Sequence, residues 1–206
     1  MAFVDAGRKG ATTLINRDDV DVSVNYPEVQ LHEAVSGKHI VLDGELVVMT
    51  NGVPDFYATR SRALMRNDFK IDLASKLTPV SFVAFDILYK DGKNLCNLEL
   101  TKRKEILSKT VIENEFFSVS RVIEVEGLKL FEMAVKNNLE GVIAKKVDSI
   151  YQPNKRTTDW LKFVNPKFPS FKLAIMPLSR LIRALWPSIL AAMPLIFLDN
   201  SICCSL

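Results

Sequence analysis

The amino-acid sequence predicts an α+β fold, in which helices flank a mainly antiparallel β-sheet core. Two long segments rich in β-branched residues, 39–50 and 79–89, each end at a turn sequence. The turns are Asn51-Gly52 and Lys90-Asp91-Gly92-Lys93, and such sequences favour tight hairpins that join antiparallel strands. Helical segments lie between the strands at irregular intervals, unlike the regular alternation of a parallel βαβ fold.

The remaining elements follow from shorter patterns. Residues 98–111 have helical character, with Thr101 as the expected N-cap. Residues 127–138 form an expected amphipathic helix, whose apolar face is predicted to carry Leu128, Phe131, Val135 and Leu139. Further strands are expected at residues 11–16, 141–146 and 160–164.

The texture of the sequence changes after Pro166, which divides the chain into a domain of residues 1–167 and a tail of residues 168–206. The tail is rich in Leu, Ile, Ala and Met and contains several prolines. Its apolar run, 185–198, is too short and too interrupted to predict a membrane span. Three interpretations remain open: a segment foreign to the domain, as a shifted reading frame would produce, a hydrophobic anchor, or a helix that binds a partner or completes the domain.

Charge does not by itself predict a nucleic-acid partner. The chain has 27 basic and 24 acidic residues, and its whole excess of +3 lies from Lys167 onward, so residues 1–166 are balanced. Three cysteines without metal-binding spacing favour a reducing compartment, and charged residues near Met1 do not resemble a signal peptide. We therefore expect a cytoplasmic protein.

The segment 41–48 places two carboxylates on one side of a strand. Because side chains alternate along a strand, Asp43 and Glu45 share a face, opposite the apolar residues Leu42, Leu46 and Val48. Two carboxylates there are costly unless they meet a cation or a donor. The pair indicates either a site for metal or ribose, or a solvated strand face.

Phe85 is a further candidate residue for a site. Phe85 shares a predicted face with Ser81, Val83 and Ile87, where it either stacks on a purine base or packs in the core.

Glu140 opens the strand 141–146, and Lys145 and Lys146 close it. Lys162 lies between apolar neighbours in the last strand. Lysines at these places either hold a polyphosphate or extend to solvent.

Taken in order, these segments resemble ATP-dependent DNA ligases of the bacterial and archaeal end-joining type, within the superfamily of covalent nucleotidyltransferases. The resemblance covers residues 1–167. It is carried by segments that match the family's "NRxGxDV", "YPEL", "VLDGEIV", "PDFYALQSR", "AFDIL", "EGVIAKK" and "WLK" motifs, namely residues 16–22, 26–29, 41–48, 54–62, 84–88, 140–146 and 160–162.

The resemblance implies a nucleotidyltransferase fold and a ligase that seals nicked double-stranded DNA in repair and recombination, with ATP and Mg²⁺ as cofactors. A lysine attacks the α-phosphate of ATP, AMP passes to the 5′-phosphate at the nick, and the 3′-hydroxyl then displaces AMP. The implied roles are ribose or metal binding for Glu45, adenine stacking for Phe85, metal orientation for Glu140, α-phosphate contacts for Lys145 and Lys162, and a nucleotide or DNA contact for Arg17.

The sequence departs from the family pattern in three ways. It contains no "KxDG" motif, which carries the nucleophilic lysine, and Lys90-Asp91-Gly92 lacks the intervening residue. Val164 stands where the family's "WLKxK" has its second lysine. The tail does not resemble an OB-fold domain. We therefore expect a domain truncated at both ends and inactive alone, or alternatively a non-catalytic module that binds ATP or nicked DNA and acts with another chain.

Overall fold

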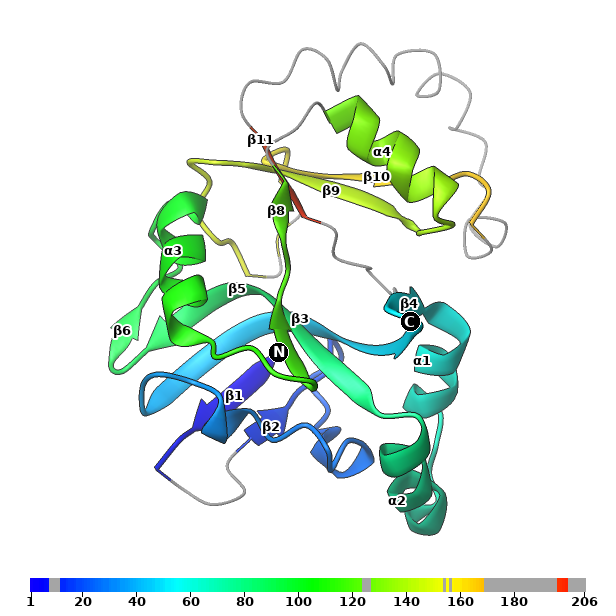
Figure 1. The fold of residues 1–206 in the computed structure, drawn as a ribbon. Helices are drawn as coiled ribbons and strands as arrows, with labels where there is room; N and C mark the ends of the chain where they lie inside the picture. Colours follow the sequence, from blue (N-terminus) through cyan, green and yellow to red (C-terminus); the bar gives the residue numbers. More distant parts are fainter. Residues whose placement is uncertain (8–11, 124–126, 154, 156, 169–195, 200–206) are drawn as a thin grey trace. The chain divides into compact units, whose positions relative to one another are not determined.

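The computed structural model describes residues 1–7, 12–123, 127–153, 155, 157–168 and 196–199 of the chain (Figure 1). The chain divides between Ser120 and Arg121 into two compact units, each with its own sheet. We describe each unit separately.

The first unit contains a seven-stranded sheet in which β2, β1, β3, β5 and β6 lie in that order, with β4 paired to β3 and β7 paired to β5. The strands are β1 (Ala2–Asp5), β2 (Thr12–Leu14), β3 (His39–Thr50), β4 (Val53–Asp55), β5 (Val80–Lys90), β6 (Lys93–Asn94) and β7 (Phe117–Val119). Its helices are α1 (Phe56–Ala63), α2 (Asp68–Leu77) and α3 (Leu100–Thr110), with short 3-10 turns at Ser23–Asn25 and Leu31–Glu33. Every described strand pair is antiparallel except β5 with β7, which confirms the predicted α+β class.

Both predicted hairpin turns are present. Thr50 pairs with Val53, and Lys90 pairs with Lys93, so each hairpin has a two-residue loop. Both residues of each loop have positive φ, at 53° and 76° in Asn51-Gly52 and at 48° and 88° in Asp91-Gly92. Positive φ at both positions is what a type I′ turn requires, and its twist matches that of the flanking strands.

Strand β5 contains two extra residues relative to β3. Asp43 pairs with Asp86 and Gly44 with Ala84, so Phe85 has no partner on β3. Leu88 is likewise skipped, between Ile87 and Tyr89. A bulge reverses the alternation of side chains beyond it. The prediction that Ile87 shares a face with Phe85 is therefore wrong: Ile87 is fully buried in the main core with Phe82 and Ala84.

Helices α1 and α2 were not expected from the sequence. Asp55 begins α1 by accepting a hydrogen bond from the Ala58 N–H at 2.9 Å, and Asn67 begins α2 by accepting one from the Lys70 N–H at 3.0 Å. Helix α2 packs mainly through Ile71 and Ala74.

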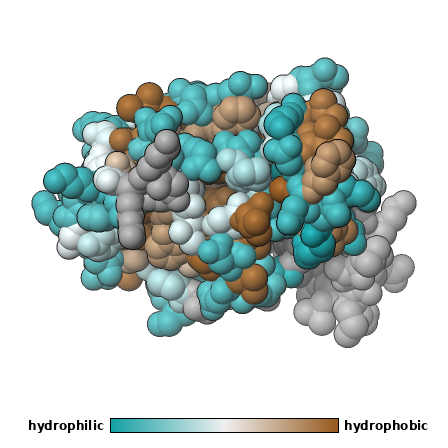
Figure 2. Space-filling view, turned by 90° about the horizontal axis from the view of Figure 1, so that it is seen from below, coloured by the Kyte–Doolittle hydropathy of each residue, from teal (hydrophilic) through white to brown (hydrophobic). Residues whose placement is uncertain are grey.

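The surface seen from below mixes apolar and hydrophilic side chains (Figure 2).

Helix α3 begins one residue before the predicted N-cap. Its N-cap is Glu99, whose side chain makes no capping hydrogen bond, and Thr101 lies inside the first turn. The expectation for Thr101 is therefore wrong, because the buried Leu100 already belongs to the helix.

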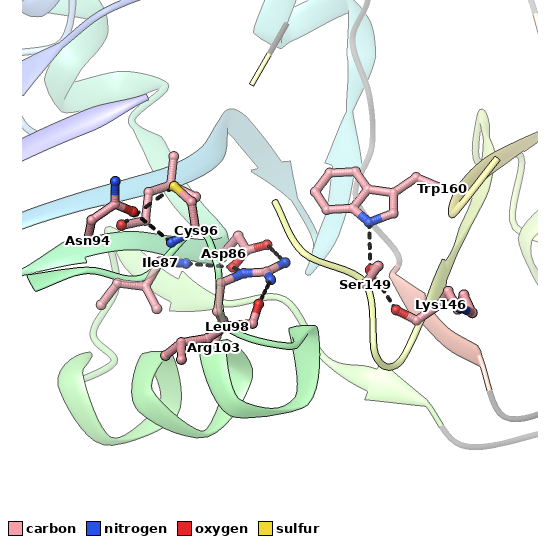
Figure 3. A network of polar contacts seen from close by, with 10 residues as sticks. Asp86, Ile87, Asn94, Cys96, Leu98, Arg103, Lys146, Ser149 and Trp160 are labelled. Carbon is pink, nitrogen blue, oxygen red and sulfur yellow. Dashed lines mark hydrogen bonds and ion pairs between the residues drawn. The ribbon is translucent and has the colours of Figure 1, made fainter. Parts of the chain in front are cut away.

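Two buried ion pairs fix α1 and α3 of the first unit. Arg103 of α3 donates from Nε and Nη2 to the two carboxylate oxygens of Asp86 on β5, at 2.8 and 2.9 Å, and neither side chain is exposed (Figure 3). Arg62 of α1 donates from Nη2 to Oε1 of Glu28 at 2.6 Å, and the same oxygen accepts from the Val80 N–H at 3.0 Å. Charges this deeply buried hold one geometry, because separating them leaves a desolvated ion.

The second unit has a four-stranded sheet in the order β10, β9, β11, β8 and one described helix, α4. Their bounds are β8 (Val122–Ile123), α4 (Gly127–Lys136), β9 (Gly141–Lys146), β10 (Trp160–Val164) and β11 (Ile196–Asp199). The described pairs are all antiparallel. Strands β9 and β10 begin and end where the sequence predicts.

Helix α4 packs on the sheet with a face that includes Phe131 and is continued by Leu139, as predicted, and that excludes Leu128. Leu130 and Ala134 are buried against the sheet, with Phe131 and Leu139 partly buried beside them. Leu128 is 38% exposed. The apolar stripe is thus centred on Leu130 and Ala134, and the placement of Leu128 on it is wrong, because Leu128 lies on a side of the helix that does not face the sheet.

Most of the tail lies outside the described residues, so the domain boundary at 167 stays a prediction. Its described part, β11, pairs with β9 through Ile196 opposite Lys146 and with β8 through Asp199 opposite Val122. No helix in the described part of the chain has both the length and the hydropathy to cross a membrane.

Asp91 gives the first unit a predicted pH dependence. Its Oδ1 accepts hydrogen bonds from the N–H groups of His39 and Lys38, at 3.0 and 2.7 Å. Both bonds lower the pKa of Asp91, and the bond from His39 has the larger effect. A carboxyl whose pKa is lower when folded contributes stability that is complete above its unfolded pKa and is lost as the pH falls through the folded pKa.

We expect the urea concentration at the unfolding midpoint to decrease when the pH is lowered below about 4. The decrease should be smaller in Asp91→Asn, which keeps a residue that tolerates positive φ. Parallel midpoint curves for the two proteins would show that Asp91 does not contribute.

Candidate functional site

The two strands β9 and β10 separate apolar from charged side chains. Val142 and Ala144 of β9 pair with Phe163 and Leu161 of β10, and these four side chains pack on the face that α4 covers. Lys145 pairs with Trp160, and Lys162 pairs with Ile143. Because side chains alternate along each strand, Lys145 and Lys162 lie together on the face opposite α4.

Glu140 and Lys162 form an ion pair at this face. Lys162 Nζ lies 2.7 Å from Glu140 Oε1, and the two side chains are 30% and 7% exposed. The second oxygen, Glu140 Oε2, is buried and has no hydrogen-bond partner among the described residues. A buried carboxylate oxygen without a donor is uncommon and indicates a ligand, an ion or a water at that position.

The orphaned oxygen fits a Mg²⁺ ligand. Mg²⁺ prefers carboxylate oxygens and is usually held by one or two carboxylates together with substrate phosphates. No cluster of three or more His, Cys, Asp or Glu side chains occurs in the described residues. Glu140 therefore suits a metal that a phosphate-bearing substrate helps to bind, and does not suit an all-protein metal cage.

Glu140 is held in place by residues that the sequence analysis missed. Asn165, which is 1% exposed, donates its N–H to Glu140 O at 2.6 Å and its side-chain amide to Leu139 O at 2.9 Å. A Cβ added at Gly141 would lie 2.0 Å from Phe163 O. The glycine thus lets β10 approach β9 closely beside Glu140, the residue directly before β9. The only sequence signal for Asn165 is its position directly after a strand.

Lys145 is almost completely buried, and an aromatic ring lies against its ammonium group. Lys145 is only 1% exposed, and its Nζ lies 4.4 Å from the centre of the Trp160 ring. The indole Nε1 donates to Ser149 Oγ at 3.1 Å (Figure 3). The sequence placed Trp160 in the "WLK" motif without a role, and it did not indicate Ser149.

In the first unit, the structure brings Glu45 and Phe85 onto one face of the sheet. Glu45 pairs with Val83 on β5, and Phe85 is the bulged residue two positions further along. Both side chains are half-buried, and Leu42, Leu46 and Val48 contribute to the core on the other face, as predicted. Bulges are frequent beside functional sites, because they re-aim a side chain.

The segment around Asp43 and Gly44 is closely packed. A Cβ added at Gly44 would lie 2.5 Å from the Phe82 ring and 2.6 Å from Val83 O. The Met1 amino group is near Asp43: burial lowers the pKa of this amino group, and the negative charge of Asp43 partly offsets the shift. Only glycine fits between the two carboxylates of this strand.

Arg17 lies on an exposed turn of the first unit. Asn16 Oδ1 accepts hydrogen bonds from the Asp18 and Val20 N–H groups, both at 2.9 Å, and so fixes the turn. The Arg17 side chain is 63% exposed and lies 3.9 Å from Asp18. It is well placed to reach a ligand outside the unit, and its salt bridge is weak.

Comparison with known proteins identifies relatives along most of the chain. Residues 2–163 match the family model described as "ATP dependent DNA ligase domain". The chain is 36% identical over 155 residues to the multifunctional non-homologous end joining protein LigD of Mycobacterium bovis, across 74% of this chain and 19% of that protein. It is 32% identical over 153 residues to the SPbeta prophage-derived DNA ligase-like protein LigB of Bacillus subtilis, across 74% of this chain and 53% of that protein.

A solved structure is similar as well. The structure described as mycobacterial DNA ligase D complexed with ATP and MES is 32% identical and aligns with a TM-score of 0.59, over 78% of this chain and 49% of that one. The chain thus spans 53% or less of the length of these relatives.

Proposed function

The chain belongs to the ATP-dependent DNA ligase domain family, and from this we propose that it is the adenine-nucleotide-binding part of a ligase that seals nicks in double-stranded DNA. One observation carries the proposal: the ion pair of the buried Glu140 with the partly exposed Lys162 leaves Glu140 Oε2 without a described partner, and it lies at the same strand pair as the buried Lys145. Two lysines and an acidic side chain on neighbouring strands suit a nucleotide phosphate with its metal ion.

In the second unit, Lys145 and Lys162 would bind the α-phosphate of ATP through charge-assisted hydrogen bonds, and Glu140 would hold Mg²⁺. When bound, Mg²⁺ offsets phosphate charge and polarises the phosphorus–oxygen bonds. Glu140 also orients the Lys162 ammonium by its contact of 2.7 Å.

In the first unit, Phe85 would stack on the adenine, and Glu45 would accept a hydrogen bond from the ribose or bind metal. The half-buried position of both side chains on one face, away from the core, supports these roles. Arg17 would contact the nucleotide or the DNA backbone near the nick, which its exposure permits. We propose that this protein acts in DNA repair or recombination in the cytoplasm.

The sequence of 206 residues contains no Lys-x-Asp-Gly segment. We therefore propose that this chain binds ATP without forming a lysine–AMP intermediate by itself. Residues 1–167 would supply the ligase part, and the tail of residues 168–206 adds β11 to the sheet of the second unit. We keep as a second candidate function a module that binds ATP or nicked DNA and acts with another chain that provides the nucleophile.

Charge removal at the strand pair tests nucleotide binding. Lys145→Met and Lys162→Met keep the bulk of the side chain and remove its charge, so we expect each to weaken ATP binding by about tenfold or more, the equivalent of one charge-assisted hydrogen bond. Isothermal titration calorimetry with ATP and Mg²⁺ measures the effect. Lys146→Met is the matched control, because Lys146 is the next residue but is exposed and pairs with Asp148 at 3.1 Å. Equal losses in all three variants would contradict the assignment.

The absence of self-adenylylation has its own test. The chain is incubated with Mg²⁺ and ATP labelled at the α-phosphate, and we expect no label to remain on the protein after denaturation, because the sequence lacks the motif that carries the nucleophile. Retained label would overturn this expectation. In that case Lys90→Arg tests the one lysine that precedes Asp-Gly, whose Nζ donates to Thr110 Oγ1 at 2.9 Å.

A further inference from the structure

Trp160 and Lys145 face each other across the β9–β10 pair. They are direct partners in the strand register, and the Lys145 ammonium lies 4.4 Å from the centre of the indole ring. An ammonium within about 6 Å of an indole centre is attracted by the negative charge of the ring face, and more strongly where water is excluded. Lys145 meets that condition, because it is only 1% exposed.

The indole is itself fixed by the turn that follows β9. Its Nε1 donates to Ser149 Oγ at 3.1 Å, and Ser149 Oγ donates to Lys146 O at 2.6 Å. The Tyr151 ring contacts the indole edge to face, with centroids 5.4 Å apart and an interplanar angle of 75°. Figure 3 shows the contacts of Trp160 with Ser149 and of Ser149 with Lys146. The ring therefore cannot rotate freely, and its orientation is set by residues that do not touch a nucleotide in the proposed function.

We propose that Trp160 is a positioning residue for phosphate binding, with Ser149 as the anchor that sets its orientation. The indole face restrains the Lys145 ammonium on the side of the sheet that Lys162 shares, and this contact uses none of the ammonium's hydrogen bonds. A lysine side chain carries high rotamer entropy, so restraint before binding lowers the entropy lost when a phosphate is bound. The inference rests on the proposed function, because it assigns the polyphosphate as the ligand of Lys145.

Three variants separate the ring from its anchor. Trp160→Leu removes the aromatic face, and Trp160→Phe keeps a face without the N–H. Ser149→Ala keeps the indole and removes the hydroxyl that accepts from its N–H and donates to Lys146 O. The first readout is the chemical shift of the Lys145 ε-methylene protons in nuclear magnetic resonance spectra. A ring face shifts these protons upfield, so we expect the shift in the unaltered chain, its loss in Trp160→Leu and a reduced shift in the other two variants.

The second readout is the dissociation constant of inorganic tripolyphosphate, which has neither base nor ribose. We expect about a tenfold weakening in Trp160→Leu and about a threefold weakening in Ser149→Ala and Trp160→Phe, the range of one desolvated cation–π contact. In the Lys145→Met background, Trp160→Leu should cause no further loss. A ring with a merely structural role would weaken binding equally in both backgrounds.

The outcomes distinguish this inference from the proposed function. If the unaltered chain binds tripolyphosphate and Trp160→Leu binds it equally well, the positioning role is wrong and the proposed function stands. If the unaltered chain does not bind tripolyphosphate, the proposed function is wrong, and the inference falls with it. Loss of binding that persists unchanged in the Lys145→Met background would also overturn the positioning role.

Discussion

Replacement of Arg103 by methionine should lower the free energy of unfolding of the first unit by about 3–5 kcal/mol, the cost of leaving one member of a buried ion pair alone. Arg103 and Asp86 are both fully buried, and the guanidinium binds both carboxylate oxygens. Its remaining nitrogen, Nη1, donates to Leu98 O at 2.5 Å, which ties the start of α3 to β5. Without the arginine, Asp86 would keep only the hydrogen bond of 2.9 Å from the Ile87 N–H among the described contacts of Oδ1.

Urea denaturation followed by circular dichroism measures this loss. The matched control is Lys76→Met in α2, because Lys76 lies at the same 2.8 Å from Asp72, but its side chain is 68% exposed. An exposed pair contributes about 1 kcal/mol or less, so the control should unfold near the midpoint of the unaltered chain. The double variant Asp86→Leu/Arg103→Met should recover much of the loss, since no lone charge remains. If Arg103→Met matches the Lys76→Met control, the buried pair does not stabilise the fold.

Replacement of Gly141 by alanine should destabilise the second unit by about 3 kcal/mol, the upper end of the usual cost of overpacking. The added Cβ would lie 2.0 Å from Phe163 O, 2.9 Å from Phe163 C and 3.0 Å from Val164 Cα. All three are backbone atoms of β10, so no side-chain rotation relieves the clash, and the two strands must separate. Because Lys162 lies on β10 and Glu140 directly precedes β9, we expect nucleotide binding to weaken as well.

Hydrogen exchange locates the effect. The amides of β9 and β10 should exchange faster in Gly141→Ala, whereas those of β3 and β5 in the first unit should keep their rates. Gly7→Ala is the control, because the nearest atom to its added Cβ is Asp5 Oδ1 at 3.5 Å, an ordinary contact distance. Unchanged protection of β9 and β10 would mean that the strand pair adapts to the methyl group.

The strands of the hairpins could be predicted from the sequence because their signals are local. Asn51-Gly52 and Asp91-Gly92 adopt the positive φ values that such dipeptides favour, and the residues beside them pair as a two-residue loop dictates. The bulge at Phe85 gives no such signal. It arises from how β5 pairs with β3, which are distant in sequence, so the face of Ile87 could not be read from alternation alone.

The helices show a similar limit. Asp55 and Asn67 are favourable N-caps, but the segment of α1 has few apolar residues in helical spacing. In α2 the spaced apolar residues Phe69, Leu73 and Leu77 are exposed, and the helix is buried at Ile71 and Ala74. In α4 the spacing predicted the helix correctly and misplaced Leu128, because burial depends on where the sheet lies. Propensity locates a helix better than it locates the buried face.

The candidate site was predictable as a set of charged residues, and its support was not. Glu140, Lys145 and Lys162 stand out because charges are rare beside apolar strand residues. Asn165 and Ser149 act through contacts made only after β9 and β10 pair, so their types and positions in the sequence reveal little. The "WLK" motif marks Trp160 but does not reveal its contact with Lys145. Second-layer residues of this kind are found from contacts and not from motifs.

The two skipped residues of β5 have a consequence for anyone who exchanges segments between members of this family. The bulge at Phe85 exchanges the two faces on which the following side chains of β5 lie. The bulge at Leu88 exchanges them again, so the pairing of Ile40 with Lys90 has the same alternation as the pairs before Phe85. Residues 85–88 therefore behave as one cassette. Removing a single residue from it should turn one end of β5 inside out, whereas transplanting the whole cassette preserves the order at both ends.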